Sequence, residues 1–174
     1  MDKNIEFKIY KYNEQESINK ALNILISCGA YTNEEKIKVL DCANSIFIAI
    51  TTSGIIVPQD RDNIGIIGCK RIFFEESNLE FLKYYPNKNN YLYKIEFIHI
   101  NSSYLDMEYR EKVLYELIET CLKDKNECAS IIDTSCIKEY NEDLIPVLIN
   151  KCNFKITKDK NNNDVYVRYP ILHN

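Results

Sequence analysis

Residues 100–117 read INSSYLDMEYREKVLYEL, and this stretch decides how the chain folds. The β-branched and aromatic residues just before it, at 91–100, predict a strand that leads into it. Its second half opens a helix, because apolar residues recur at the spacing of one buried helical face: Val113, Leu114, Leu117, Ile118, Cys121 and Leu122. The stretch therefore predicts a strand, a short connection and an amphipathic helix that ends near Lys123.

The chain before this stretch predicts one strand, two helices and two or three antiparallel strands. Residues 5–10 alternate apolar and polar residues, as a strand with one buried face does. The boxes Asn13-x-x-Glu16 and Thr32-x-x-Glu35 each place a capping side chain at the start of a helix. β-branched runs predict the strands that follow, at residues 46–52, 55–57 and 64–74.

The chain after this stretch predicts a strand, a helix and a closing hairpin. These elements are expected at residues 129–133, 142–151, 154–158 and 165–171, with a turn at 161–164. The full order is then β-α-α-β-β-β-α-β-α-β-β. With no internal repeat or linker, we expect one mixed α/β domain over residues 1–174.

The composition excludes several classes of protein. The chain has 174 residues, a net charge of −4 and no basic block, so nucleic acid is not an expected partner. No window approaches the roughly 20 apolar residues of a membrane span, and residues 1–13 lack the apolar run of a signal peptide. Seven scattered cysteines without a C-x-x-C pair, and only two histidines, predict reduced, buried thiols and no metal site. We expect a cytoplasmic protein with no membrane association.

Four stretches, the last of them the final hairpin, resemble the GNAT N-acetyltransferase family. Residues 100–117 are similar, without a gap, to the family pattern I-E-x-L-x-V-x-P-E-Y-R-G-K-G-I-G-x-L. Residues 67–72, IGCKRI, resemble its third-strand pattern I-V-G-x-x-R-L, and residues 144–154 resemble A-I-P-L-Y-E-K-L-G-F with one residue added. The final hairpin agrees as well. The resemblance implies the GNAT fold, a central and mostly antiparallel sheet of about six to seven strands flanked by about four helices.

The resemblance also implies a site for acetyl-CoA as co-substrate. It assigns the pantetheine to the backbone of Ser103, Tyr104 and Leu105, and the pyrophosphate to Arg110, Glu111, Lys112, Val113, Leu114 and Tyr115. In the family, glycines at three of these positions let the backbone approach the phosphate oxygens. This chain has Glu111, Val113 and Tyr115 there, which are acidic, β-branched and bulky.

A different local structure is compatible with the same residues. Asp106 is a good N-cap and Glu108 suits a first helical turn, so the helix can begin about four residues earlier than in the family. The amides of Glu111 to Tyr115 would then already be paired inside the helix. A helix that begins there would offer no anion cradle at these residues.

Acetyl transfer in the family needs a base for the amine and an acid for the leaving thiolate. The match places the strand-four carboxylate of the family on Asn101, which leaves Glu96 as the candidate base. The tyrosine acid of the family falls on Leu148 or Ile149, so the nearest substitute is Tyr140. The rival interpretations are a solvated Glu96 and a surface or packing Tyr140. His99 is expected to be a core or edge histidine rather than a proton shuttle.

Two functions are compatible with a sequence that matches the family pattern at some positions and departs from it at others. The first is transfer of an acetyl group from acetyl-CoA to the amine of a small molecule or peptide, in a cleft near residues 29–33 and 75–90. The net charge of −4 favours a cationic amine as the acceptor. The second is a non-catalytic GNAT-fold module that binds a protein or small ligand. The sequence is compatible with a homodimer.

Overall fold

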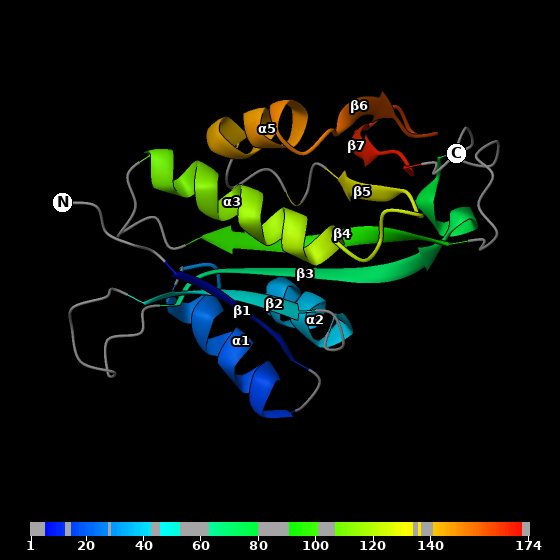
Figure 1. The fold of residues 1–174 in the computed structure, drawn as a ribbon. Helices are drawn as coiled ribbons and strands as arrows, with labels where there is room; N and C mark the ends of the chain where they lie inside the picture. The colour runs from blue at the N-terminus through cyan, green and yellow to red at the C-terminus, as the bar shows by residue number, and fades with distance from the viewer. Residues whose placement is uncertain are drawn as a thin grey trace.

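A mixed sheet of seven strands, in the order β1-β2-β3-β4-β5-β7-β6, forms the centre of the protein (Figure 1). The structure, a computed structural model, describes residues 6–12, 15–27, 29–42, 46–52, 63–79, 91–100, 107–133, 136 and 141–171. The strands are β1 Glu6–Tyr12, β2 Ile46–Thr52, β3 Asn63–Phe73, β4 Tyr91–Ile100, β5 Ser130–Asp133, β6 Lys155–Lys158 and β7 Asp164–Arg168. The helices are α1 Gln15–Ser27, α2 Asn33–Asp41, α3 Met107–Leu122 and α5 Asn141–Asn150, with a 3-10 turn η1 at Phe74–Ser77.

The order of these elements confirms the predicted succession of strands and helices. All neighbouring strands are antiparallel except β4 and β5, which pair in parallel. A parallel pair needs a crossover connection, and α3 supplies it. The predicted cap at Asn13 and the run at 55–57 lie outside the described residues.

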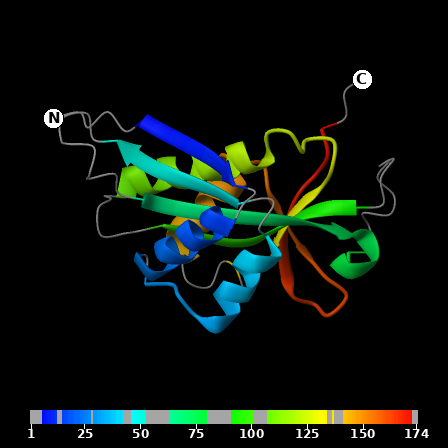
Figure 2. The same cartoon turned by 90° about the horizontal axis from the view of Figure 1, so that it is seen from below.

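Of the α-helices in the described part of the chain, two cover each face of the sheet. Figure 1 shows α3 and α5 on one face and α1 and α2 on the other, and Figure 2 views the second face from below. The larger core lies under α3 and α5. It contains all six residues of the predicted stripe, each at most 3% exposed: Val113, Leu114, Leu117, Ile118, Cys121 and Leu122. The prediction of an amphipathic helix after β4 is therefore confirmed.

A β-bulge in β4 decides which way Glu96 points. Gly68 of β3 pairs with Phe97, and the next residue of β3, Cys69, pairs with Ile95, so Glu96 is the extra residue. Ile95 and Ile98 both pack in the core under α3. The two residues between them therefore both face the α1 and α2 side.

Gly68 makes room for this arrangement. A Cβ at this position would lie 2.3 Å from the ring of Phe97, which no real contact allows. Phe97 is 1% exposed and belongs to the core under α1 and α2. The glycine of the IGCKRI stretch is thus required by close packing across the bulge.

The described cysteines are buried and stand outside any disulfide: Cys42, Cys69, Cys121, Cys128, Cys136 and Cys152. Burial raises the pKa of Cys136 and of Cys152 to about 12, which keeps both thiols protonated at neutral pH. The expectation of reduced, buried thiols is confirmed for these six residues. Among the helices that the structure describes, none is long and apolar enough to cross a membrane.

Candidate functional site

The sheet opens beside the second half of β4. β5 pairs with β4 only from Tyr93 to Ile95 and ends at Asp133, while β4 continues for five residues, from Glu96 to Ile100. No strand in the described part of the chain pairs with this side of those five residues. Unpaired backbone donors and acceptors on a strand edge can bind an extended ligand in the way a further strand would.

The carboxylate of Glu96 lies where this opening begins. Glu96 is 8% exposed, so the interpretation of a solvated Glu96 is wrong, and the reason is the bulge. Its Oε1 lies 3.1 Å from Nζ of Lys70 and 3.5 Å from Nζ of Lys94, as ionic contacts without a well-aligned hydrogen bond. A buried carboxylate needs such charges nearby, because desolvation of an isolated one is very unfavourable.

Lys94 is shared between two carboxylates. Its Nζ also lies 3.0 Å from Oδ2 of Asp133 at the end of β5. Burial alone would lower the pKa of Lys94, but Asp133, followed by Glu96, outweighs this and raises it. Lys94 therefore stays charged at neutral pH and ties the ends of the β4 and β5 pairing together.

A hollow of about 250 Å³ adjoins these lysines. It is lined by polar and apolar residues from β3, η1, β4, β5 and the hairpin: Lys70, Ile72, Glu76, Ser77, Asn78, Lys94, Ile131, Asp133, Asp159 and Val165. Part of the connection expected to border the acceptor cleft, at 76–78, contributes to it. The other expected border, residues 29–33, is not among the lining residues.

A second buried polar group joins α2 to β4. Nε2 of His99 lies 2.8 Å from Oε2 of Glu35, and Nζ of Lys38 lies 2.7 Å from Oε1 of Glu35. Burial alone would raise the pKa of Glu35, but the hydrogen bonds from His99 and Lys38 outweigh it and lower the pKa. The ring of His99 stacks on Phe97 at 6.2 Å between centroids. His99 is thus a satisfied, buried histidine, as the sequence predicts.

Thr32 caps α2 as the sequence predicts, but Glu35 serves a different purpose. The N–H of Glu35 donates to Oγ1 of Thr32 at 3.1 Å, which is half of a capping box. The side chain of Glu35 instead contacts His99 and Lys38. Burial alone would lower the pKa of Lys38, but the hydrogen bond to Glu35 and the negative charge of Glu35 outweigh it and raise the pKa. The expected box residue is therefore part of a tertiary contact.

The start of α3 follows the earlier of the two possible helix starts. α3 begins at Met107, so the amides of Glu111 to Tyr115 fall inside the helix, where each is positioned to bond the carbonyl four residues before it. Val113 and Leu114 are buried in the core. Backbone amides left over for an anion belong to the first helical residues, Met107 to Tyr109.

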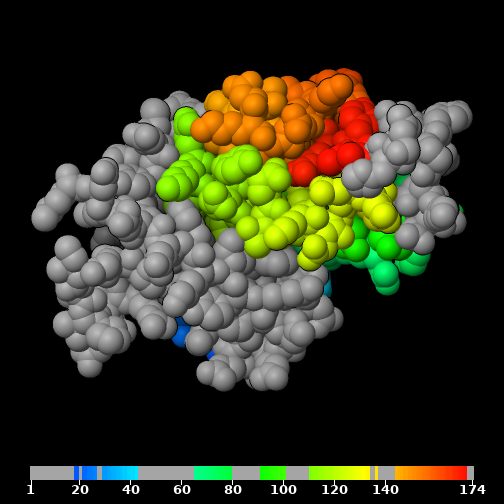
Figure 3. Space-filling view, viewed as in Figure 1, coloured from blue at the N-terminus to red at the C-terminus, as the bar shows by residue number. Residues whose placement is uncertain are grey.

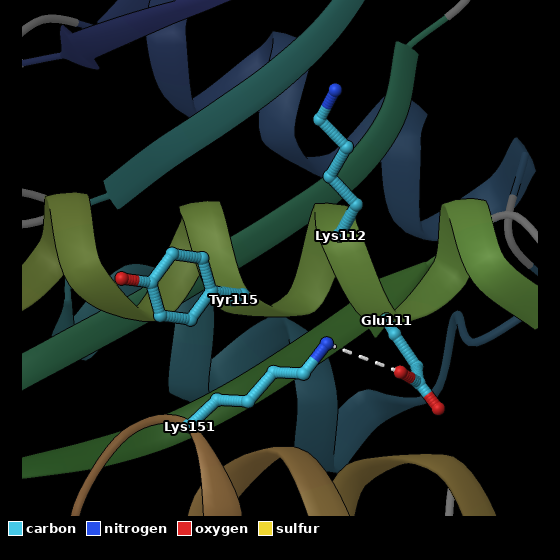
Figure 4. A pocket seen from close by; sticks show the side chains of 4 residues that line it. All are labelled: Glu111, Lys112, Tyr115 and Lys151. Carbon is cyan, nitrogen blue, oxygen red and sulfur yellow. Dashed lines mark hydrogen bonds and ion pairs between the residues drawn. The ribbon is translucent and has the colours of Figure 1, made fainter.

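The side chains after that first turn border a hollow between α3 and α5. Its volume is about 510 Å³ and its lining residues are Glu111, Lys112, Tyr115 and Lys151. Figure 4 shows Glu111 and Lys151 directed toward one another and Lys112 directed away from this pair. Nζ of Lys151 donates to Oε2 of Glu111 at 3.2 Å. In the space-filling view, α3 and α5 lie side by side on this face (Figure 3).

Several predicted site residues lie outside the described residues. They are Ser103, Tyr104 and Leu105, assigned to the pantetheine, and Tyr140, assigned as the acid. Lys70, Lys94, Asp133 and Lys151 are site residues that the sequence did not single out. Lys70 and Lys151 each had a signal, their places in the IGCKRI stretch and in the stretch at 144–154. No group of three or more potential metal ligands occurs among the described side chains, so the structure offers no candidate metal site there.

Solved structures match the chain over nearly its whole length, whereas no family model and no curated protein sequence matches it. NAA60 of Arabidopsis thaliana, crystallised in complex with acetyl-CoA, gives a TM-score of 0.63 at 13% identity, over 94% of this chain and 99% of that one. Arylalkylamine N-acetyltransferase 2 from Aedes aegypti gives 0.55 at 11%, over 95% and 99%. The NatC complex bound to Gag peptide and CoA gives 0.53 at 14%, over 97% and 99%. Together with the sheet order and the opening at β4, these matches establish that the chain has the fold of the GNAT N-acetyltransferases.

Proposed function

We propose that the protein transfers an acetyl group from acetyl-CoA to the amine of a small molecule or peptide. The observation that carries this proposal is the opening of the sheet at β4, with the buried carboxylate of Glu96 at its inner end. A carboxylate is kept there although burial disfavours it, and two lysines hold it in place. A site of this kind suits proton transfer next to a bound, extended co-substrate.

Acetyl-CoA fits one part of the site well. The pantetheine is a chain of amides, and the edge of β4 from Glu96 to Ile100, with which no described strand pairs, offers backbone partners for it. Ser103, Tyr104 and Leu105 continue this contact in the proposal. The pyrophosphate would then reach the first turn of α3, where unpaired amides favour an anion.

Glu96 is the proposed general base, and Tyr140 remains the proposed acid. The amine nitrogen forms a bond to the acetyl carbon, the carbon–sulfur bond of the thioester breaks, and Glu96 takes a proton from the amine. Tyr140 gives a proton to the thiolate that leaves. A general base of this kind contributes a factor of about 10² to 10⁴ to the rate of the reaction. The lysine partners of Glu96 act by positioning the carboxylate.

The acceptor amine would enter through the hollow beside Lys70 and Lys94. Among the side chains that line it, three are acidic and two are basic, and both lysines contact carboxylates. A cationic amine is therefore favoured over an anionic substrate. The acceptors named for similar structures are consistent with this: NatC is bound to a peptide, and another neighbour is an arylalkylamine N-acetyltransferase.

A non-catalytic binding module is the second candidate, and the start of α3 favours it. With Glu111 to Tyr115 inside the helix, the backbone cradle of the family is missing at these residues. A carboxylate about 4 Å from a phosphate charge costs on the order of 4 kcal/mol at an effective dielectric constant of about 20. A module of this kind would keep the sheet and bind another ligand at the opening.

Binding of acetyl-CoA and turnover separate the two candidates. We expect acetyl-CoA to bind in calorimetry and, at 100 times its dissociation constant, to raise the free energy of unfolding by about 2.7 kcal/mol. Release of the CoA thiol with a panel of mono-amines, diamines and peptides would identify the acceptor class. Binding without turnover on the panel supports the second candidate. Absence of binding at millimolar acetyl-CoA refutes the first.

The proposed enzyme acts in the cytoplasm as one domain over residues 1–174, without nucleic acid or membrane as partner. A homodimer remains part of the proposal. Size-exclusion chromatography with light scattering, at several protein concentrations, measures the oligomeric state directly.

A further inference from the structure

The hollow of about 250 Å³ beside β4 has an apolar floor. Three residues from neighbouring strands, Ile72, Ile131 and Val165, line it, and each is at most 7% exposed. All three belong to one buried cluster. Contact with such a surface favours methylene groups, because it removes them from water. The part of a ligand that lies over this floor is therefore expected to be aliphatic.

One end of the hollow lies next to Glu96 and has balanced charges. Lys70 and Lys94 both contact Oε1 of Glu96, at 3.1 and 3.5 Å, and Lys94 also contacts Asp133 at 3.0 Å. Two ammonium groups thus face two carboxylates, so this end suits a neutral amine, the form that attacks a thioester. Oε1 of Glu96 is buried and accepts no hydrogen bond from the described residues, so an N–H of the ligand can supply one.

The other charged residues of the lining, Glu76 and Asp159, are both acidic. Glu76 lies in η1 and Asp159 at the hairpin, and the N–H of Lys160 joins these two segments by donating to the carbonyl of Asn78 at 3.2 Å. Hydrogen bonds from Asn163, first of all from its backbone N–H, lower the pKa of Asp159 and keep it charged at neutral pH. This end carries net negative charge and suits an ammonium group.

We propose that the hollow binds an aliphatic diamine, with one nitrogen beside Glu96 and the other, as an ammonium group, beside Glu76 and Asp159. The inference rests on the proposed function, because it names the acceptor class of that reaction. The first nitrogen forms a bond to the acetyl carbon as the carbon–sulfur bond breaks, and its proton passes to Glu96. The leaving thiolate takes a proton from Tyr140, as proposed for other amines. The second nitrogen keeps its protons, and the methylene chain lies over the apolar floor.

The arrangement of charges distinguishes a diamine from other amines. A mono-amine would leave the carboxylates of Glu76 and Asp159 facing water alone. An amino acid of similar length would bring its own carboxylate to them, and like charges at this distance repel. Along β3, Ile72 lies between Lys70 and η1, so the apolar floor separates the balanced end from the acidic end. A chain of methylene groups with an amine at each end matches this succession.

Three amines of similar length test the preference, because they differ only at the far end. Putrescine carries a second ammonium group, butylamine a methyl group and γ-aminobutyrate a carboxylate. Release of the CoA thiol from acetyl-CoA measures kcat/KM of the wild-type protein for each. We expect putrescine to exceed butylamine by about tenfold, the product of two exposed charge contacts, and γ-aminobutyrate to be the poorest. Equal values for putrescine and butylamine overturn the inference.

D159N and E76Q test the acidic end separately. Each should lower kcat/KM for putrescine by about two- to fivefold, through KM, and leave butylamine unchanged. The asparagine keeps an acceptor oxygen for the turn, and E76Q leaves the hairpin untouched. D124N is the matched control, because Asp124 is exposed in the turn after α3 and does not line the hollow. The inference is overturned if D159N and E76Q lower the values for both amines equally, or if D124N acts as they do.

Calorimetry with putrescine separates failure of this inference from failure of the proposed function. If putrescine binds wild type, binds D159N and E76Q more weakly, and no amine is acetylated, the diamine site stands and the enzyme proposal fails. If putrescine and butylamine are acetylated equally well by wild type and by both variants, the enzyme stands and the diamine site is refuted. If no amine is acetylated and millimolar putrescine does not bind, both proposals are refuted.

Discussion

The opening at β4 and the start of α3 flank the same connection, yet they depart from the GNAT pattern to different degrees. At β4, a bulge, a required glycine and a buried carboxylate combine in a densely packed place. At α3, the three glycine positions of the family carry Glu111, Val113 and Tyr115, and the helix simply begins earlier. The difference teaches that buried packing fixes the fold here, whereas the sequence at the start of α3 can depart from the family pattern while the fold is kept.

The largest expected effect is that of E96Q on acetyl transfer. The amide fills the same space but cannot accept the proton of the amine, so kcat should fall by about 10²- to 10⁴-fold. The measurement is release of the CoA thiol with the best acceptor from the amine panel. E127Q, an exposed change in the turn before β5, is the control and should retain full activity. Equal activity of E96Q and wild type would rule out Glu96 as the base.

The next effect concerns the packing that holds the bulge. F97A removes a ring that is 1% exposed and packs against Gly68, so it should lower the free energy of unfolding by about 3–5 kcal/mol. Urea denaturation measures the loss. F73A, in which a ring that is 59% exposed is removed from β3, should change stability by less than about 1 kcal/mol. A similar loss in both variants would contradict the claim that packing across the bulge is special.

The buried contact between α2 and β4 gives a pH-dependent effect. The pKa of Glu35 is lowered from its ordinary value of 4.5, so its contribution to stability is present above that value and is lost as the pH falls through the lowered pKa. The pKa of Lys38 is raised from 10.5, so its contribution is present below 10.5 and is lost as the pH rises beyond it. E35Q should therefore be less stable than wild type by about 1–3 kcal/mol near neutral pH, and the gap should narrow at both extremes.

Urea denaturation of both proteins over a range of pH checks this. E34Q is the matched control, because Glu34 is the exposed neighbour of Glu35 in α2. Its stability relative to wild type should stay nearly constant with pH. If the difference in free energy of unfolding between E35Q and wild type did not change with pH, the contacts of Glu35 with Lys38 and His99 would contribute no pH-dependent stability.

The sequence could predict those parts of the fold that depend on neighbours along the chain. The buried apolar stripe of α3 follows the helical period, and the cap at Thr32 depends on two residues that are three positions apart. Both could therefore be predicted from the sequence. The buried state of Glu96 was not, because strand alternation carries no information about a bulge whose cause is the packing of Phe97 over Gly68. The contacts of Lys151 with Glu111 and of His99 with Glu35 join residues 40 and 64 positions apart, and only the tertiary fold brings them together.

The smallest effect tests the α3 side of the comparison, through the pair E111G and E111A. Both variants remove the exposed ion pair with Lys151, so their shared loss should be no more than about 1 kcal/mol. They differ only in backbone preference: in a helix interior, glycine is less favourable than alanine by about 1 kcal/mol. E111G should therefore be the less stable of the two by that amount, as measured by urea denaturation. If residue 111 instead lay in a loop before the helix that favours glycine, the free energy of unfolding of E111G would equal or exceed that of E111A. That result would refute the early start of α3 at Met107.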